Sequence, residues 1–253
     1  MELKQGNDEA AYRREWLYLH AEEPPTVAHP FGVPVIPDDR GIHNRGVITY
    51  PKSPGRHPAI LILTQVVLPS ENAADDDRAA YGLQTRLTEN GNVVLIVGPR
   101  PSPPGTEEIK APILGPFYLT ELRAELVGKT ILGMRVDDII RAVDYLASRT
   151  DVDPNRISAQ ASGHLALALL HAAILDPRLK HITVTGALPS YDSLLKSPMP
   201  VDAPHDILPG VLLHYDIPDL LHLLDSRVTL TNQQPATSNQ QPETRNQKPE
   251  TRN

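Results

Sequence analysis

Apolar residues in this chain form two patterns, short unbroken runs and helical repeats, which alternate from about Gly46 to Thr231. The runs Pro58–Leu63 and Asn92–Val97 are almost entirely apolar, a pattern typical of strands covered on both faces of a parallel sheet. Shorter segments predict the remaining strands. These are Val47–Tyr50, Arg156–Gln160, Ile182–Thr185 and Arg227–Thr231, with Val211–Leu213 as a short strand or a loop anchor.

The helical repeats predict helices of two kinds. Within Val136–Leu146 the apolar residues recur at helical spacing, and Asp137, Asp138, Arg141 and Asp144 fall on the other face, which predicts an amphipathic surface helix. Leu165–Leu175 is apolar nearly all round apart from His171, which predicts a helix buried under the centre of the sheet. Leu119–Gly128 is a third candidate. Strands alternating with helices predict a doubly wound, mostly parallel α/β sheet.

The two ends of the chain differ from this middle part. We expect residues 1–45 to be a lead-in, with a short helix over Ala11–Leu19 around Trp16 and a proline-rich extended stretch after it. Residues 46–231 form the predicted domain. Residues 232–253 repeat a seven-residue unit that contains a proline and no large apolar residue, so we expect this tail to be disordered.

Composition narrows the classes of function. The 253 residues include 24 Lys and Arg against 31 Asp and Glu, a formal net charge of −7, which argues against binding to nucleic acid or to anionic membranes. Cysteine is absent, so the chain forms no disulfide, thiolate metal site or cysteine nucleophile. The amino-terminal residues are polar and contain no apolar signal segment, which predicts a cytoplasmic protein.

Four segments carry a family resemblance, and together they cover about Gly46 to Thr231. They are Arg135–Leu146, Asp153–Ile157, Leu175–Arg178 and Tyr215–Leu220. They resemble acetyl-xylan-esterase-like α/β-hydrolases and the related dipeptidyl-peptidase-type hydrolase domains. The resemblance implies an α/β-hydrolase fold and hydrolysis of carboxylic esters, such as acetylated sugars, through an acyl-enzyme.

In that family a sharp turn between a strand and a buried helix carries the nucleophile in a Gly-x-Ser-x-Gly frame. Counted from Ile157, where such strands begin in the family, the nucleophile slot falls at Gly163, which has no nucleophilic side chain. Of the two flanking positions, Ala161 is small as the turn requires, but Leu165 is not. The family frame is therefore kept in length and position but not in chemistry.

Two other residues are weak candidates for a role in this site. Ser162 falls on the turn only after a shift of one residue, and its flanks would then be the bulkier Gln160 and His164. A better interpretation of Ser162 is a helix N-cap, for which serine is well suited. Gln65, after the run that ends at Leu63, could offer an oxyanion-hole N–H.

The rest of a catalytic triad is missing from its usual place. If Arg227–Thr231 is the penultimate strand, the acid and the histidine should follow it, but the last histidine in the chain is His222. Without a histidine, a serine hydroxyl is a weak nucleophile at neutral pH. We therefore expect the sheet to lack the family's final strand and helix.

The sequence predicts neither a cofactor nor a metal site. His164 and His171 lie seven residues apart on the predicted buried helix and are interpreted as core or interface histidines. The main hypothesis is an inactive α/β-hydrolase domain. One alternative is a serine esterase that uses Ser162 on a small ester substrate. The other is a binding or assembly module that associates with itself through an open sheet edge.

Overall fold

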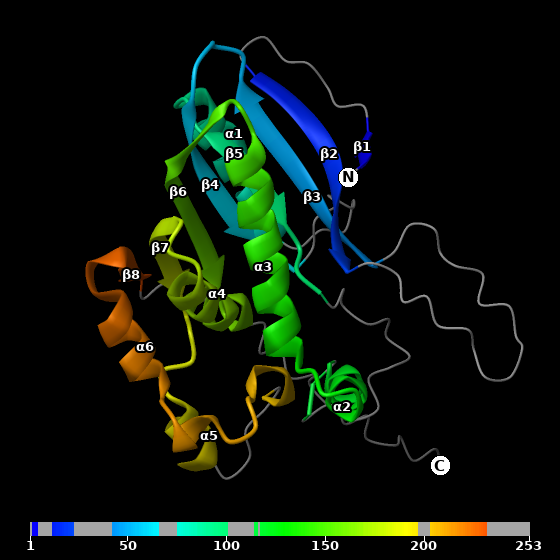
Figure 1. The fold of residues 1–253 in the computed structure, drawn as a ribbon, viewed down its shortest axis with the longest axis vertical. Coiled ribbons are helices and arrows are strands. Elements are labelled where there is room, and N and C mark those ends of the chain that lie inside the picture. The colour runs from blue at the N-terminus through cyan, green and yellow to red at the C-terminus, as the bar shows by residue number, and fades with distance from the viewer. Residues whose placement is uncertain are drawn as a thin grey trace, which may run out of the picture.

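The computed structural model describes residues 2–4, 12–22, 42–65, 75–100, 114–115, 117–196 and 203–231. One sheet of eight strands crosses the molecule in the order β1-β2-β3-β5-β4-β6-β7-β8 (Figure 1). The strands are β1 Glu2–Lys4, β2 Tyr12–Glu22, β3 Ile42–Pro51, β4 His57–Leu63, β5 Val93–Val97, β6 Val152–Ser162, β7 Leu179–Thr185 and β8 Val228–Thr231. The sheet is open.

Five neighbouring strands, β5, β4, β6, β7 and β8, run parallel to one another. All five residues of β5 are buried, in agreement with the prediction that unbroken apolar runs are covered on both faces. Because the strands are parallel, their carboxyl ends meet at one edge of the sheet, where α/β proteins bind ligands.

The amino-terminal strands β1, β2 and β3 pair antiparallel, and β3 joins β5 antiparallel as well. The helix predicted over Ala11–Leu19 is therefore wrong, since β2 covers this segment from Tyr12 onward. Its aromatic residues favour an extended conformation, and pairing with β3 over almost the whole of β2 satisfies the backbone hydrogen bonds. The proline-rich stretch after Glu22 and the repeat tail 232–253 lie outside the described residues.

Helices cover both faces of the sheet. They are α1 Asp75–Glu89, α2 Tyr118–Leu126, α3 Ile131–Ser148, α4 His164–Leu175, α5 Tyr191–Lys196 and α6 Ile217–Leu224. The larger core cluster joins α3 and α4 to one face of the sheet, and α1 packs its Leu83 and Leu87 on Ile62, Val94 and Ile96 of the other. Figure 1 shows α3 crossing the front of the sheet with α4 beside it.

All three helices predicted within residues 46–231 are present, and two details change. Leu165 to Ala173 of α4 are buried, as its apolar pattern predicted, and α2 matches the candidate helix over Leu119–Gly128. Asp138 of α3, however, is fully buried and does not lie on the exposed face. The segment Val211–Leu213 is a single turn of 3-10 helix, η3, and not a strand.

Candidate functional site

The turn between β6 and α4 lies at the carboxyl edge of the sheet and centres on Gly163. Gly163 is the N-cap of α4, with φ 56° and ψ −130°, a conformation that residues with side chains rarely adopt. Its N–H donates to the Thr185 carbonyl at the end of β7 (2.9 Å), and its carbonyl accepts from Ala166 (3.0 Å). The position assigned to the nucleophile thus lies on a sharp strand-to-helix turn.

The surroundings of Gly163 leave room for a side chain. A β-carbon built on Gly163 would meet no heavy atom within 4 Å, so packing does not require glycine here. The backbone conformation does favour it. The turn therefore keeps the shape and the open space of a nucleophile turn while its residue carries no reactive group.

Ser162 occupies the last position of β6 and is exposed. Side chains alternate along a strand, and Ile157, Ala159 and Ala161 all join the core cluster beneath α3 and α4, so Ser162 belongs to the opposite face. No imidazole of the described residues is hydrogen-bonded to its hydroxyl. The N-cap interpretation of Ser162 is wrong, because Gly163 is the cap and no side chain bonds the first turn of α4.

Gln65 follows β4 at the same edge of the sheet and is exposed. The neighbouring Thr64 N–H donates to the Val97 carbonyl (3.1 Å), which fixes the start of this loop against β5. The role of Gln65 as an oxyanion-hole donor stays a prediction.

A polar cluster that the sequence did not reveal lies beside the turn. His164 Nδ1 donates to Asp206 Oδ2 across 2.5 Å, and the rings of His164 and His205 pack edge to face with centroids 4.0 Å apart. His205 and Asp206 belong to a short 3-10 helix, η2, over Pro204–Asp206. One carboxylate and two imidazoles thus meet next to Gly163.

Arg135 of α3 lies against this cluster and is almost fully buried. Its guanidinium lies 4.0 Å from Asp206 Oδ1, 3.5 Å from His205 Nδ1 and over the ring of Phe117. Burial, reinforced by His164 and Arg135, lowers the pKa of His205 to about 2, so this imidazole is neutral at physiological pH. Burial raises the pKa of the nearby Glu121, whose Oε2 accepts the Ile131 N–H at 2.7 Å.

His171, the other histidine of α4, is a core residue, as its position predicted. Its Nδ1–H donates to the Leu167 carbonyl (2.8 Å), and its Nε2 accepts the Tyr215 hydroxyl (3.1 Å). Burial lowers its pKa, and the bond to Leu167 opposes that shift. Both ring nitrogens of His171 are hydrogen-bonded within the protein, so neither is available to bind a ligand.

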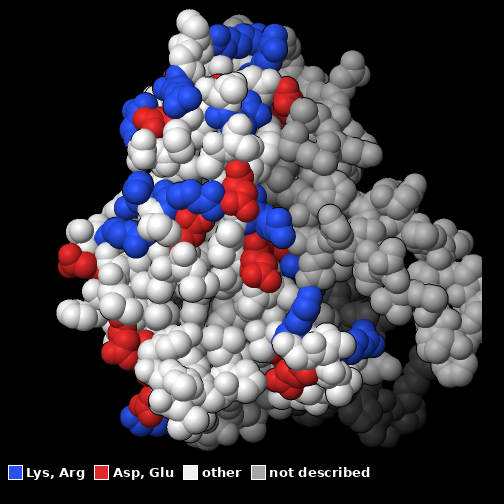
Figure 2. All heavy atoms as spheres, viewed as in Figure 1, with Lys and Arg blue, Asp and Glu red and all other residues white. Residues whose placement is uncertain are grey.

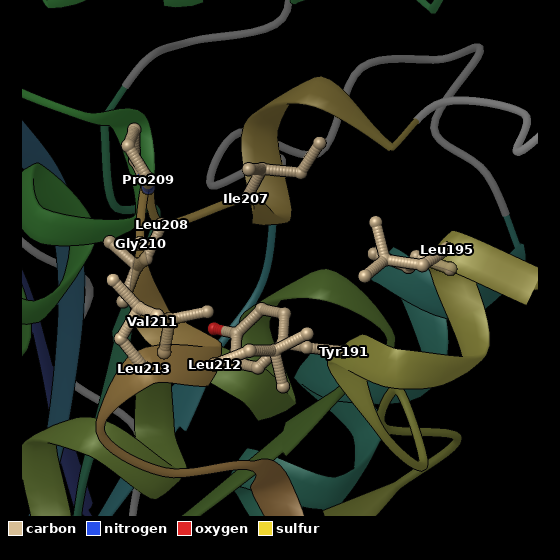
Figure 3. A pocket seen from close by; sticks show the side chains of 10 residues that line it. Tyr191, Leu195, Ile207, Leu208, Pro209, Gly210, Val211, Leu212 and Leu213 are labelled. Atoms are coloured by element: carbon tan, nitrogen blue, oxygen red, sulfur yellow. The ribbon is translucent and has the colours of Figure 1, made fainter.

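An apolar cavity of about 290 Å³ lies between α5 and the segment that follows η2. Figure 3 shows side chains of α5 and of Ile207–Leu213 around this hollow. Its lining includes Tyr191, Leu195, Ile207 and Leu212, and Ile207 directly follows Asp206 of the polar cluster. The cavity suits an apolar group of a small ligand.

One face of the molecule shows how its charged side chains are distributed. On the face drawn in Figure 2, acidic and basic side chains are interspersed and form no broad basic area. No helix among the described residues is long and apolar enough to cross a bilayer.

Comparison with known proteins settles the fold. No protein-family model and no curated protein matches this sequence. The structure is similar to a putative acetyl xylan esterase from Bacteroides fragilis, with a TM-score of 0.66 and 13% identity over 91% of this chain and 61% of that one. It is also similar to a glucuronoyl esterase from Solibacter usitatus, with a TM-score of 0.56 and 15% identity over 90% and 66% of the two chains.

The chain has an α/β-hydrolase fold. At these identities the likeness concerns the α/β-hydrolase fold and not the reaction. The chain also spans only 61% and 66% of the length of these two proteins.

Three residues of the cluster escaped the sequence analysis, namely Arg135, His205 and Asp206. Arg135 gave one usable signal, since it is a charged residue among the apolar positions Ile131, Leu132 and Val136 that open α3. Buried charges usually have partners, which could have prompted a search for one. No local pattern joins His164 to Asp206, because 42 residues separate them.

Proposed function

We propose that this chain is an esterase-type α/β-hydrolase domain that binds carboxylic esters without cleaving them through an acyl-enzyme. Gly163, which occupies the turn where the fold presents its nucleophile, is the observation that carries the proposal. A glycine side chain has no oxygen or sulfur that could attack an ester carbonyl. The acyl-enzyme step therefore has no nucleophile at this position.

Ser162 is a poor substitute for the missing nucleophile. It lies on the face of β6 opposite the residues that pack beneath α4, and no described histidine activates its hydroxyl. An unactivated serine is a weak nucleophile at neutral pH. The hypothesis of a working serine esterase therefore has less support than that of a domain without this chemistry.

Ester binding is supported by two observations. The two similar structures are both described as esterases, and this chain has an apolar cavity of about 290 Å³ next to the polar cluster. An apolar acyl or alkoxy group fits such a cavity.

The experiment uses the full chain, an activated acetyl ester and a fluorophosphonate that labels activated serines. We expect turnover no faster than in buffer, no covalent label, and saturable binding of a non-hydrolysed ester analogue. Ser162→Ala should behave as the wild type does. Ser53→Ala, which replaces an exposed serine distant from Ser162 in the sequence, should do so as well.

Turnover or labelling that is lost in Ser162→Ala and kept in Ser53→Ala would establish a serine esterase and overturn the proposal. Absence of both turnover and analogue binding would refute the ester-binding part and leave only the fold.

A further inference from the structure

We propose that His164, His205 and Asp206 bind a divalent transition-metal ion, with Zn²⁺ the best match to their chemistry. One ligand atom from each of these residues lies within 4.8 Å of the other two. The three come from two elements, the start of α4 and the 3-10 helix η2. The inference does not depend on the proposed ester binding.

The two oxygens of Asp206 indicate where a cation would lie. Oδ2 accepts a hydrogen bond from His164, whereas Oδ1 is buried and accepts none from any described residue. Oδ1 lies 3.9 Å from His205 Nε2 and 4.0 Å from Arg135. A buried carboxylate oxygen without a hydrogen bond is unfavourable, and coordination to a metal would relieve this.

Two imidazoles and one carboxylate are a donor set that zinc prefers. Zinc binds histidine nitrogen at about 2.0–2.1 Å and carboxylate oxygen at about 2.0–2.2 Å, and three protein ligands leave a fourth position open. The 2.5 Å contact of His164 with Asp206 is shorter than the spacing of two ligands on one zinc ion. A metal would therefore replace the proton between them, with a small outward movement of the half-exposed His164 ring.

Arg135 opposes a second cation in this space, since its guanidinium faces both Asp206 and His205. The carboxylate of Glu121, which also interacts with Arg135, offsets part of that charge. We therefore expect binding weaker than at a closed structural zinc site. The Arg135 guanidinium also lies over the Phe117 ring, 5.4 Å from its centroid.

The test is calorimetric titration of the chelator-treated full chain with Zn²⁺, together with the visible absorption of its Co²⁺ form. We expect one ion per chain at this site, a Co²⁺ spectrum of tetrahedral type, and a rise in melting temperature with Zn²⁺. His164→Ala and Asp206→Asn should each lower the affinity by more than about tenfold. The control is His222→Ala, an exposed histidine of α6 outside the cluster.

Equal affinity of the wild type, His164→Ala and His222→Ala would place the ion elsewhere and overturn the proposal, as would no binding by the wild type. Circular dichroism checks that each variant is folded. If Asp206→Asn fails to fold, His164→Ala decides, because His164 is partly exposed and its loss leaves no buried charge at its own position.

Discussion

At the scale of single residues, Gly163 determines both the backbone conformation of the turn and the proposed absence of a nucleophile there. Residues with side chains are strained at its φ of 56°, and such strain costs about 1–3 kcal/mol where it is tolerated. A nucleophile at this turn must bear that strain, whereas glycine relieves it.

Replacement by alanine should have opposite effects on stability at two glycines. Gly163 and Gly82 both have open space for a β-carbon, but only Gly163 has a positive φ. Gly163→Ala should lower the free energy of unfolding by about 1–3 kcal/mol. Gly82→Ala, on the exposed side of α1, should raise it by about 0.5–1 kcal/mol. Urea unfolding of both variants gives the two values, and a stabilised Gly163→Ala would contradict the assigned turn.

The residue scale also shows where sequence reasoning stops. Gly163 could be placed on the turn by counting from Ile157, because the distance between strand and helix is a local property. His205 and Asp206 could not be placed beside His164, because only the tertiary fold brings segments 42 residues apart together. The burial of Asp138 could not be predicted for the same reason, since its partner Arg100 lies 38 residues earlier in the chain.

At the scale of elements, the charges within α3 differ in their surroundings. Asp138 is fully buried and holds Arg100, just after β5, through the Arg100 N–H at 2.8 Å and its guanidinium at 2.8–3.1 Å. This pair attaches the loop at the carboxyl end of β5 to the centre of α3. Asp137, the adjacent residue, is exposed.

We expect Asp138→Ala to lower the free energy of unfolding by about 3–5 kcal/mol, because it leaves the buried side of Arg100 without its carboxylate. Asp137→Ala should change it by less than about 0.5 kcal/mol. Thermal and urea unfolding of the two variants measure this difference. Similar values for both would show that the ion pair does not anchor the loop.

The start of α6 predicts a dependence on pH. Burial opposes ionisation of Asp216, but hydrogen bonds from Ser190 and from the N–H groups of Tyr191, Ile217 and Asp192 outweigh it and lower its pKa. Asp216 also forms a reciprocal capping box with Asp219. A carboxyl with a lowered folded-state pKa stabilises the fold above its unfolded value of about 3.9, and this stability is lost as the pH falls through the folded value.

Asp216→Asn should therefore lose less stability than the wild type between pH 6 and pH 2, since asparagine still caps the helix but does not titrate. Urea unfolding at a series of pH values measures the two slopes. Asp137→Asn, which changes an exposed carboxyl of α3, serves as the comparison. Parallel curves for Asp216→Asn and the wild type would exclude Asp216 as a source of acid sensitivity.

The elements themselves were predictable where packing and pattern agree. The parallel strands and α4 were evident from unbroken apolar runs, because both faces of each are covered. The strand β2 was not, since the charged and aromatic residues of Tyr12–Glu22 fit a short helix equally well. Pairing with β3 decides between them, and pairing is a property of two segments and not of one.

At the scale of the whole molecule, the sheet ends at β8, and no described strand pairs with its outer edge. Leu230 of β8 is 55% exposed. Unpaired strand edges favour association with a second chain, so we predict self-association of this domain through β8. The sheet would then continue from β8 into a neighbouring copy of the chain.

Light scattering over a range of protein concentrations measures this association. We expect Leu230→Lys to shift the chain toward monomer, because a charge on an edge strand disfavours pairing. Leu223→Lys, at an exposed leucine of α6, should leave the distribution unchanged. A wild type that stays monomeric at all concentrations would argue against assembly through β8.

The turn at Gly163 has one further consequence. The chain contains no cysteine, and a side chain at position 163 would meet open space. Gly163→Cys would therefore create a unique thiol at the tip of β6. A fluorophore or spin label attached there would respond to any molecule that enters this edge of the sheet, whether or not that molecule reacts.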